Sequence, residues 1–315
     1  MKEIGGYIEL DTYTLPMLHE NAIKLNCGRN ALAYLIEGKG IKKIAMPKFM
    51  CDACNVVLRK YSVIVRYYSI GFDFKPVDIN LEDDEWLYLV NYYGQISNVY
   101  ISDLKTRHNR LIVDNSQAYF QRPVDGVDTI YTCRKFFGVP DGALMYTDTT
   151  LARSLVQDKS FNRMNFLLGR FERNASEFYN EYKANNEKFF DEPIKKMSRL
   201  TENLLHAIDY EKVQRQRTEN FFYLYEELKN VNALSLTIPK GAFMYPLFIK
   251  TGKIVRESLQ AKKIYIPTLW PEVLEICNTS EIEYDMASNI LPLPVDQRYS
   301  KEDMAYMVNQ IRNFI

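Results

Sequence analysis

The sequence predicts an α/β protein: a large layered domain with a mostly parallel sheet, followed by a small α+β domain. Short, nearly all-apolar segments of strand length recur through roughly the first 150 residues, as in strands that are covered on both faces. Amphipathic helical segments separate them, which is the order typical of layered α/β domains. Charged helical segments follow to about residue 230, and strand and helix then alternate again.

The first predicted helix begins at Gly28 and ends near Gly38 and Gly40. Its apolar stripe has helical spacing and consists of Ala31, Leu32, Leu35 and Ile36. A second helix is predicted over 52–60. The strands of this half are apolar or rich in β-branched and aromatic residues, and we expect them at Ile44–Met46, 63–68, Leu87–Asn91, Leu111–Asp114, Thr129–Thr132 and Ala143–Thr147.

The middle of the chain is predicted to form a helical bridge rather than a disordered segment. Charged residues dominate 170–190 and 211–230, but aromatic residues are dense throughout both. Beyond the bridge we expect a strand, a helix and a second strand at Phe243–Ile249, 252–262 and Tyr265–Ile266.

A last helix is predicted after Leu291–Pro294, with Ser300 as its N-cap and Asp303 three residues later. Its apolar face consists of Met304, Met307, Val308, Ile311 and Phe314. We therefore divide the chain into a large α/β domain with its helical extension, residues 1–208, and a bridging helix with the small α+β domain, residues 209–315.

Composition excludes several classes of protein. Forty Lys and Arg balance forty Asp and Glu, which argues against a nucleic-acid binder and against a polybasic membrane surface. The start, Met1–Tyr7, lacks the apolar core of a signal peptide, and no apolar run approaches the roughly 18 residues of a membrane span. We expect a cytoplasmic protein without structural disulfides among its five cysteines and without a metal site, because its three histidines are scattered.

An acid and an amine are predicted at one edge of the sheet. Asp114 ends a buried strand, at the edge where open α/β sheets bind ligands. Lys135 lies just beyond the next strand and precedes the turn Gly138–Gly142. From spacing alone, an ordinary ion pair at the sheet edge is the simpler interpretation, and Pro140–Gly142 alone reads as a hairpin turn.

A third feature changes this interpretation. Gly28 stands at the start of the first predicted helix, where unpaired N–H groups and the helix dipole favour phosphate. Gly28 lets the backbone approach such a group closely, and Arg29 adds a charge, although one such glycine is also compatible with a simple cap. A phosphate cradle, an acid and a lysine together predict a pyridoxal 5'-phosphate site.

Four motifs in this order extend over nearly the whole chain: Gly28–Leu32, Asp114–Gln117, Asp141–Ala143 after Lys135, and Leu291–Pro294 before a helix opened by Ser300. They resemble those of the DegT/DnrJ/StrS-type aminotransferases. The resemblance implies a three-layer α/β/α large domain of the pyridoxal phosphate-dependent transferase fold type I, and a homodimer. It also implies transfer of an amino group from glutamate to a nucleotide-linked keto sugar, in polysaccharide or related sugar biosynthesis.

The resemblance also implies roles for individual residues. Lys135 would carry the cofactor covalently and then move the substrate proton, Asp114 would hold the pyridine nitrogen, and Gln117 would lie against the ring or its phenolic oxygen. The implied cofactor-binding set is Gly28, Arg29, Asn30, Cys51, Asp114, Gln117, Thr132 and Lys135. Tyr92 and Tyr93 follow a strand at the same edge, and there substrate contact and core packing are equally open interpretations. Asn162 and Arg163, on the helical bridge, are candidates for contacts supplied across a dimer boundary.

Two positions depart from the family pattern. Ile130 occupies the place of a phosphate-side Ser, for which Thr132 or Arg29 could substitute, and Cys51 occupies the place of an aromatic that stacks on the cofactor ring. These departures favour, as the alternative, a non-catalytic relative with the same fold. A sugar dehydratase is disfavoured, because its family replaces the lysine that stands here as Lys135. Cys51 and Cys54 form a C-x-x-C motif. Its simpler interpretation is two small buried side chains, and its more specific one is a redox pair.

Overall fold

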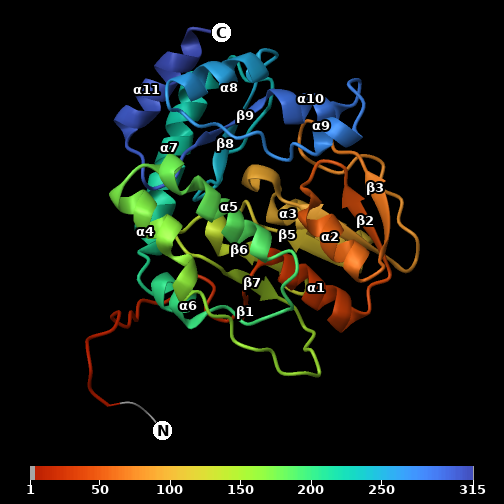
Figure 1. The fold of residues 1–315 in the computed structure, drawn as a ribbon. Helices are drawn as coiled ribbons and strands as arrows, with labels where there is room; N and C mark the ends of the chain where they lie inside the picture. Colours follow the sequence, from red (N-terminus) through yellow and green to blue (C-terminus); the bar gives the residue numbers. More distant parts are fainter. Residues whose placement is uncertain (1–3, 315) are drawn as a thin grey trace.

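The computed structural model describes residues 4–314, so Met1–Glu3 and Ile315 lie outside it. The described residues form a seven-stranded sheet in the order β1-β7-β6-β5-β4-β2-β3 (Figure 1). Its strands are β1 (Ile23–Leu25), β2 (Lys43–Pro47), β3 (Ile64–Tyr68), β4 (Glu85–Val90), β5 (Leu111–Asp114), β6 (Asp128–Thr132) and β7 (Ala143–Tyr146). The α/β fold class predicted from the sequence is confirmed.

Five of the strands, β2 to β6, run parallel to one another, and β7 and β1 are antiparallel to their neighbours. In the ladder, Asp114 at the end of β5 pairs with Val90 of β4 on one side and Ile130 of β6 on the other. The carboxyl ends of the three central strands therefore meet at one edge. The polar residues that follow each strand are brought together there.

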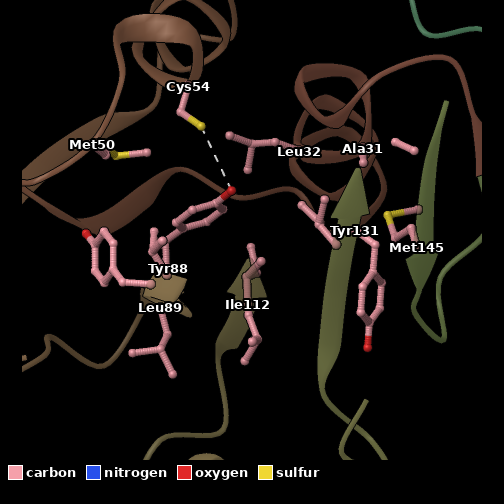
Figure 2. Close-up of a cluster of buried hydrophobic side chains, with 14 of the residues drawn as sticks. Ala31, Leu32, Met50, Cys54, Tyr88, Leu89, Ile112, Tyr131 and Met145 are labelled. Atoms are coloured by element: carbon pink, nitrogen blue, oxygen red, sulfur yellow. Dashed lines mark hydrogen bonds between the residues drawn. The ribbon is translucent and has the colours of Figure 1, made fainter. Parts of the chain in front are cut away.

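The central strands are covered on both faces, as their apolar sequences predict. Figure 2 shows Ala31 and Leu32 of helix α1 packed over the sheet, together with Tyr88 of β4, Ile112 of β5 and other side chains. Ile112 and Leu32 are almost wholly buried. The packing of this core determines where the carboxyl end of each strand lies.

Helices connect the parallel strands. Those of the first half are α1 (Gly28–Lys39), α2 (Asp52–Lys60) and α3 (Asn98–Arg107). Gly40 ends α1 in the left-handed region, with φ of 63°, and its N–H group donates to the carbonyl oxygen of Ile36. The helical bridge contains α4 (Asn165–Glu172), α5 (Tyr179–Lys188), α6 (Arg199–Leu205) and α7 (Tyr210–Leu228).

The C-terminal part lies at one end of the molecule (Figure 1). It has a second cluster of buried side chains. Its two-stranded antiparallel sheet, β8 (Met244–Phe248) and β9 (Ile290–Pro294), packs among α7, α8 and α11. The helices of this part are α8 (Gly252–Ala261), α9 (Val273–Ile276), α10 (Ile282–Asn289) and α11 (Lys301–Arg312). Ser300 and Asp303 make the predicted capping box of α11. The division at residue 208 stays a prediction.

The strand predicted at Tyr265–Ile266 is wrong: these residues lie in an irregular segment. Pro267 follows directly and has no N–H group to add to a ladder, which explains why the short apolar pair does not extend the small sheet. No helix within residues 4–314 is long and apolar enough to cross a membrane.

Candidate active site

Asp114 is held in place by two hydrogen bonds at the edge of the sheet. The backbone N–H group of Ser116 donates to Oδ1 at 2.8 Å, and the Tyr88 hydroxyl donates to Oδ2 at 2.9 Å. Tyr88 is fully buried in β4, beside the strand that Asp114 ends. The carboxylate is therefore oriented by its own turn and by the neighbouring strand.

Lys135 lies in a short helical turn, Cys133–Lys135, directly after β6. Its side chain is exposed, and Nζ lies 5.7 Å from the centre of the Phe243 ring in the C-terminal part. Within residues 4–314, no carboxylate lies at ion-pair distance from Nζ. The ordinary ion pair with Asp114, which spacing alone made the simpler interpretation, is therefore not formed in this structure.

The turn that carries Lys135 is anchored from the C-terminal part. The carbonyl oxygen of Phe136 accepts hydrogen bonds from Arg217 at 3.1 Å and from Gln297 at 2.9 Å. The Arg217 guanidinium is fully buried and lies over the Phe136 ring. The sequence does not predict that Arg217 and Gln297 belong to this site, because no spacing pattern connects them to Lys135.

Cys51 is near both residues. A hydrogen bond from Cys54 and the positive charge of Lys135 lower the pKa of the Cys51 thiol, while burial and the negative charge of Asp114 raise it, so Cys51 lies within electrostatic range of both residues. Cys51 precedes α2 as its N-cap residue, and α2 follows β2, the strand next to β4. Three residues that are distant in the sequence thus meet where the parallel strands end.

The turn after Lys135 is a buried anchor rather than an exposed hairpin turn. Asp141 is fully buried and accepts hydrogen bonds from the N–H and hydroxyl groups of Ser198 at 2.8 and 2.7 Å, and from Thr201. Burial raises the pKa of this carboxyl, while Thr201 and Ser198 hold it down. Gly142 has a φ of 116°, which a residue with a side chain adopts only with strain.

The start of α1 faces β6 across a narrow gap. A Cβ atom on Gly28 would lie only 2.8 Å from Cγ2 of Thr132, so this position accepts no side chain without a shift. Helix α1 has no acidic residue in its first turn, and its N-cap residue, Cys27, makes no side-chain cap hydrogen bond. The helix therefore presents its positive end without an internal counter-charge.

Two arginines flank the start of this helix, and no ion pair holds either of them within the described chain. Arg29 donates to the carbonyl oxygen of Asn186 at 3.2 Å, and Arg134 donates to the Asn186 side chain. The Nε atoms of both are buried without a hydrogen-bond partner among the described residues. Burial lowers the pKa of Arg134, and the nearby charge of Arg29 lowers it further. Arg134 was not predicted.

Asn30 has a structural contact instead of a free side chain. Its amide donates to Asn26 and to the carbonyl oxygen of Pro193, both at 2.8 Å, and it is buried in the first turn of α1. Its side chain therefore fixes the segment before α6 against α1. Any contribution of Asn30 to a ligand would come from its backbone.

Gln117 lies at the wall of a cavity of about 200 Å³. Its Oε1 accepts a hydrogen bond from the N–H group of Tyr93 at 2.8 Å. The cavity is lined by Gly94, Gln117, Ala118, Phe120, Gln121, Pro239, Lys240, Gly241 and Ala242. It lies between the loop after β5 and the loop before β8, so it opens where the two parts of the chain meet.

The residues expected to contact substrate are buried. Tyr92 and Tyr93 pack in the core, and the Tyr92 hydroxyl donates to the carbonyl oxygen of Phe49 at 2.5 Å. Arg163 forms a buried ion pair with Asp158 at 2.7 Å, whereas the neighbouring Asn162 is exposed. Tyr92 and Tyr93 follow β4 at the edge where Asp114 lies, since the N–H group of Asn91, just before them, donates to the carbonyl oxygen of Asp114 at 3.0 Å. Tyr93 also reaches Gln117 through its backbone.

Solved structures provide the comparison with known proteins. Similar ones include a DegT/DnrJ/EryC1/StrS aminotransferase from Brucella abortus, with 15% identity, a TM-score of 0.63, and coverage of 93% of this chain and 85% of that chain. DesV from S. venezuelae, in complex with a ketimine intermediate, has 14% identity, a TM-score of 0.63, and coverage of 93% and 84%. NtdA from Bacillus subtilis, with bound cofactor PMP, has 12% identity, a TM-score of 0.66, and coverage of 93% and 72%.

The sequence matches no protein-family model and no curated protein sequence. The likeness to the solved structures nevertheless extends over more than nine-tenths of the chain. The chain therefore has the fold of the DegT/DnrJ/EryC1/StrS aminotransferases, and the resemblance inferred from its motifs is confirmed at the level of the fold.

Proposed function

We propose that this protein is a pyridoxal phosphate-dependent aminotransferase that transfers an amino group from glutamate to a nucleotide-linked keto sugar. The observation that carries the proposal is that Asp114, Lys135 and the start of α1 lie at the same edge of the sheet. Asp114 is held by two donors, and Lys135 stands without an ion pair among residues 4–314. The fold is that of solved sugar aminotransferases, and a putative sugar aminotransferase from Streptococcus pneumoniae with this fold is a PMP form.

The residues present fit this cofactor. The carboxylate-free first turn of α1, which has no side-chain cap, suits a phosphate group. Arg29 and Arg134 add two guanidinium groups whose Nε atoms have no partner among the described residues. Together they compensate for Ile130, which is buried and has no hydrogen-bonding group to offer.

When bound, pyridoxal phosphate supplies a ring that accepts electrons from the substrate carbon as a proton leaves it. Asp114 would hold a proton on the ring nitrogen, and Tyr88 and Ser116 keep its carboxylate in position for this role. Nζ of Lys135 would carry the covalent bond to the cofactor and, once released, take and return the substrate proton. Phe136, anchored by Arg217 and Gln297, fixes the turn from which Lys135 extends.

The cavity beside Gln117 supports a polar substrate of limited size. Gln117 and Lys240 line it with an amide and an ammonium group, and its volume is about 200 Å³. A keto sugar presents hydroxyl groups that such amides bind, and its diphosphate favours a cation near the opening. The sugar itself and the pathway, which we take to be polysaccharide or related synthesis, follow from the family resemblance alone.

We further propose that the enzyme is a cytoplasmic homodimer. The helical bridge exposes large apolar side chains, which need a partner surface: Phe161, Leu168, Phe171, Tyr179 and Tyr182. A second copy of the chain would cover them and would close the site from the side of the bridge.

A non-catalytic relative is the competing proposal. Ile130 replaces a phosphate-side hydroxyl and Cys51 replaces a stacking ring, so this chain has fewer cofactor contacts than its family pattern implies. The two proposals differ in whether the protein binds and turns over the cofactor.

The decisive experiment is borohydride reduction of the protein saturated with pyridoxal phosphate, followed by peptide mapping. We expect the cofactor to be fixed on Lys135, and the Lys135→Gln variant to give no label. Lys240→Gln is the matched control, because Lys240 is the lysine that lines the neighbouring cavity. A label on Lys240, or none on saturated protein, would rule out the assignment.

Glutamate then separates an active enzyme from a non-catalytic relative. Added to the yellow, cofactor-loaded protein, it should change the visible spectrum, and a nucleotide-linked keto sugar should reverse the change. A loaded protein whose spectrum responds to none of the common amino acids would support the non-catalytic relative instead.

A further inference from the structure

Cys51 and Cys54 occupy the first turn of α2 together. Cys51 is the N-cap residue, with φ of −76° and ψ of 153°, and Cys54 is the third residue of the nine-residue helix. This spacing places both side chains on the same turn, beside the positive end of the helix dipole. All five cysteines of the chain are free thiols. The proposed aminotransferase chemistry uses the position of Cys51 but gives no role to Cys54.

The two thiols are adjacent and differ in access. Cys51 is partly exposed at the candidate site, whereas Cys54 is buried, with 9% of its surface exposed. A hydrogen bond from the Cys54 thiol lowers the pKa of Cys51 to about 7, against the effect of burial, and the charge of Lys135 contributes to the lowering. The pKa of Cys54 is raised well above its usual range by the same contact and by burial.

This asymmetry is that of a nucleophile and a resolving thiol. A thiolate is the attacking species in disulfide exchange, and the lowered pKa of Cys51 raises its thiolate fraction at neutral pH. The other cysteines have the opposite environment. Burial raises the pKa of Cys27 to about 11, and it also raises those of Cys133 and Cys277.

Cys54 is also connected to the carboxylate of the site. Its sulfur lies 3.9 Å from the Tyr88 hydroxyl, and that hydroxyl donates to Asp114 at 2.9 Å (Figure 2 shows the first contact). The buried thiol therefore ends a chain of contacts that runs from Asp114 through Tyr88 to Cys54. A change in its covalent state reaches Asp114 through one side chain.

We propose that Cys51 and Cys54 are a redox-active pair, which a low-molecular-weight disulfide such as oxidised glutathione converts into an intramolecular disulfide. The Cys51 thiolate attacks one glutathione sulfur, which forms a mixed disulfide and expels one glutathione thiolate. The Cys54 thiol then loses its proton and attacks the Cys51 sulfur, which expels the second. Two S–H bonds are lost and one S–S bond forms within the protein, and oxidised glutathione takes both electrons. This inference does not rest on the proposed function.

The test uses the full chain, equilibrated with mixtures of reduced and oxidised glutathione, quenched with acid and mapped by mass spectrometry. In excess oxidised glutathione, the peptide that carries Cys51 and Cys54 should lose about 2 Da, and dithiothreitol should restore it. Cys54→Ser should instead accumulate a mixed disulfide on Cys51, while Cys51→Ser should resist both modifications. Cys277→Ser is the matched control, and it should behave as the unaltered chain does.

Alkylation of the reduced protein gives a second, independent measurement. At pH 7, Cys51 should react with iodoacetamide at least about tenfold faster than Cys27 or Cys133, and the advantage should vanish in urea. Its rate should rise with pH around a midpoint near 7. The proposal is overturned if the pair stays reduced in excess oxidised glutathione, or if Cys51 reacts no faster than the buried cysteines. Circular dichroism of each variant excludes unfolding as the cause.

Discussion

At the scale of single residues, the candidate site depends on groups that no motif contains. Asp114 and Lys135 could be predicted because each ends or follows an apolar strand, and parallel strands end at a common edge. Tyr88 could not, because its hydroxyl reaches Asp114 only through the pairing of β4 with β5. The place of Arg134 beside the start of α1 could not be predicted either, because its lack of an ion-pair partner among the described residues is a property of the folded chain.

The Asp114→Asn variant tests the role of the carboxylate. Asn keeps the shape but cannot hold a proton on the ring nitrogen as a charged group does. We expect pyridoxal phosphate still to bind and the glutamate half-reaction, followed by stopped-flow absorbance, to slow by roughly a hundredfold or more. Asp103→Asn, in the exposed Asp103–Arg107 pair of α3, should leave the rate unchanged. An unchanged rate for Asp114→Asn would exclude it as the partner of the pyridine nitrogen.

His19 provides a prediction about pH. Its ring is fully buried. Nε2 donates to the carbonyl oxygen of Tyr119 at 2.7 Å. Nδ1 therefore carries no proton and accepts from the Tyr146 hydroxyl at 3.0 Å. Burial lowers its pKa from 6.5 to about 4, so the folded state keeps it neutral. The stability it contributes is complete above pH 6.5 and is lost as the pH falls towards 4.

We therefore expect that the free energy of unfolding, measured in urea, is about 2 kcal/mol lower at pH 5 than at pH 7 because of this one residue. His19→Gln keeps a donor for Tyr119 and an acceptor for Tyr146, so it should remove most of that pH dependence. His108→Gln, whose ring is only partly buried, is the control and should remove much less of it. Equal pH dependence in the His19 variant and the unaltered chain would contradict this account.

At the scale of secondary-structure elements, strong periodicity or clear end signals in the sequence were sufficient to predict a helix. Helices α1 and α11 follow from apolar spacing and from glycine or serine at their ends, and the capping box at Ser300 and Asp303 is formed as predicted. β1 was not predicted, because its three residues become a strand only by pairing with β7. The strand at Tyr265–Ile266 failed for the opposite reason: its apolar pair finds no partner strand within the described residues.

Contacts between elements give a prediction at the start of α8. A Cβ atom on Gly252 would lie 2.1 Å from the carbonyl oxygen of Asn289, at the end of α10. Gly252→Ala must therefore push the two helices apart, and we expect it to lower the free energy of unfolding by about 2 kcal/mol. Gly138→Ala, where the nearest atom would be 3.9 Å away, is the control and should change it far less. Equal stabilities in urea would show that the helices yield without cost.

At the scale of the whole molecule, the exposed side chains of the helical bridge predict self-association. Phe171 is 89% exposed and Leu168 is 58% exposed, both on α4. Light scattering should report twice the chain mass of 37.0 kDa, and Leu168→Glu with Phe171→Glu should give monomers. Ile254→Glu, which is 61% exposed on α8, is the matched control. A monomeric unaltered chain with its cofactor bound would contradict the homodimer.

The strand order of the large sheet also determines how the chain can fold while it is being made. A ribosome releases β1 before any other strand, yet β1 pairs only with β7, which is the last strand of that sheet to emerge. The intervening strands can assemble in the meantime, but β1 cannot join the sheet until about residue 146 has left the exit tunnel. During that interval, the backbone N–H and C=O groups of Ile23–Leu25 have no ladder partner on the nascent chain. This edge of the sheet is therefore completed last.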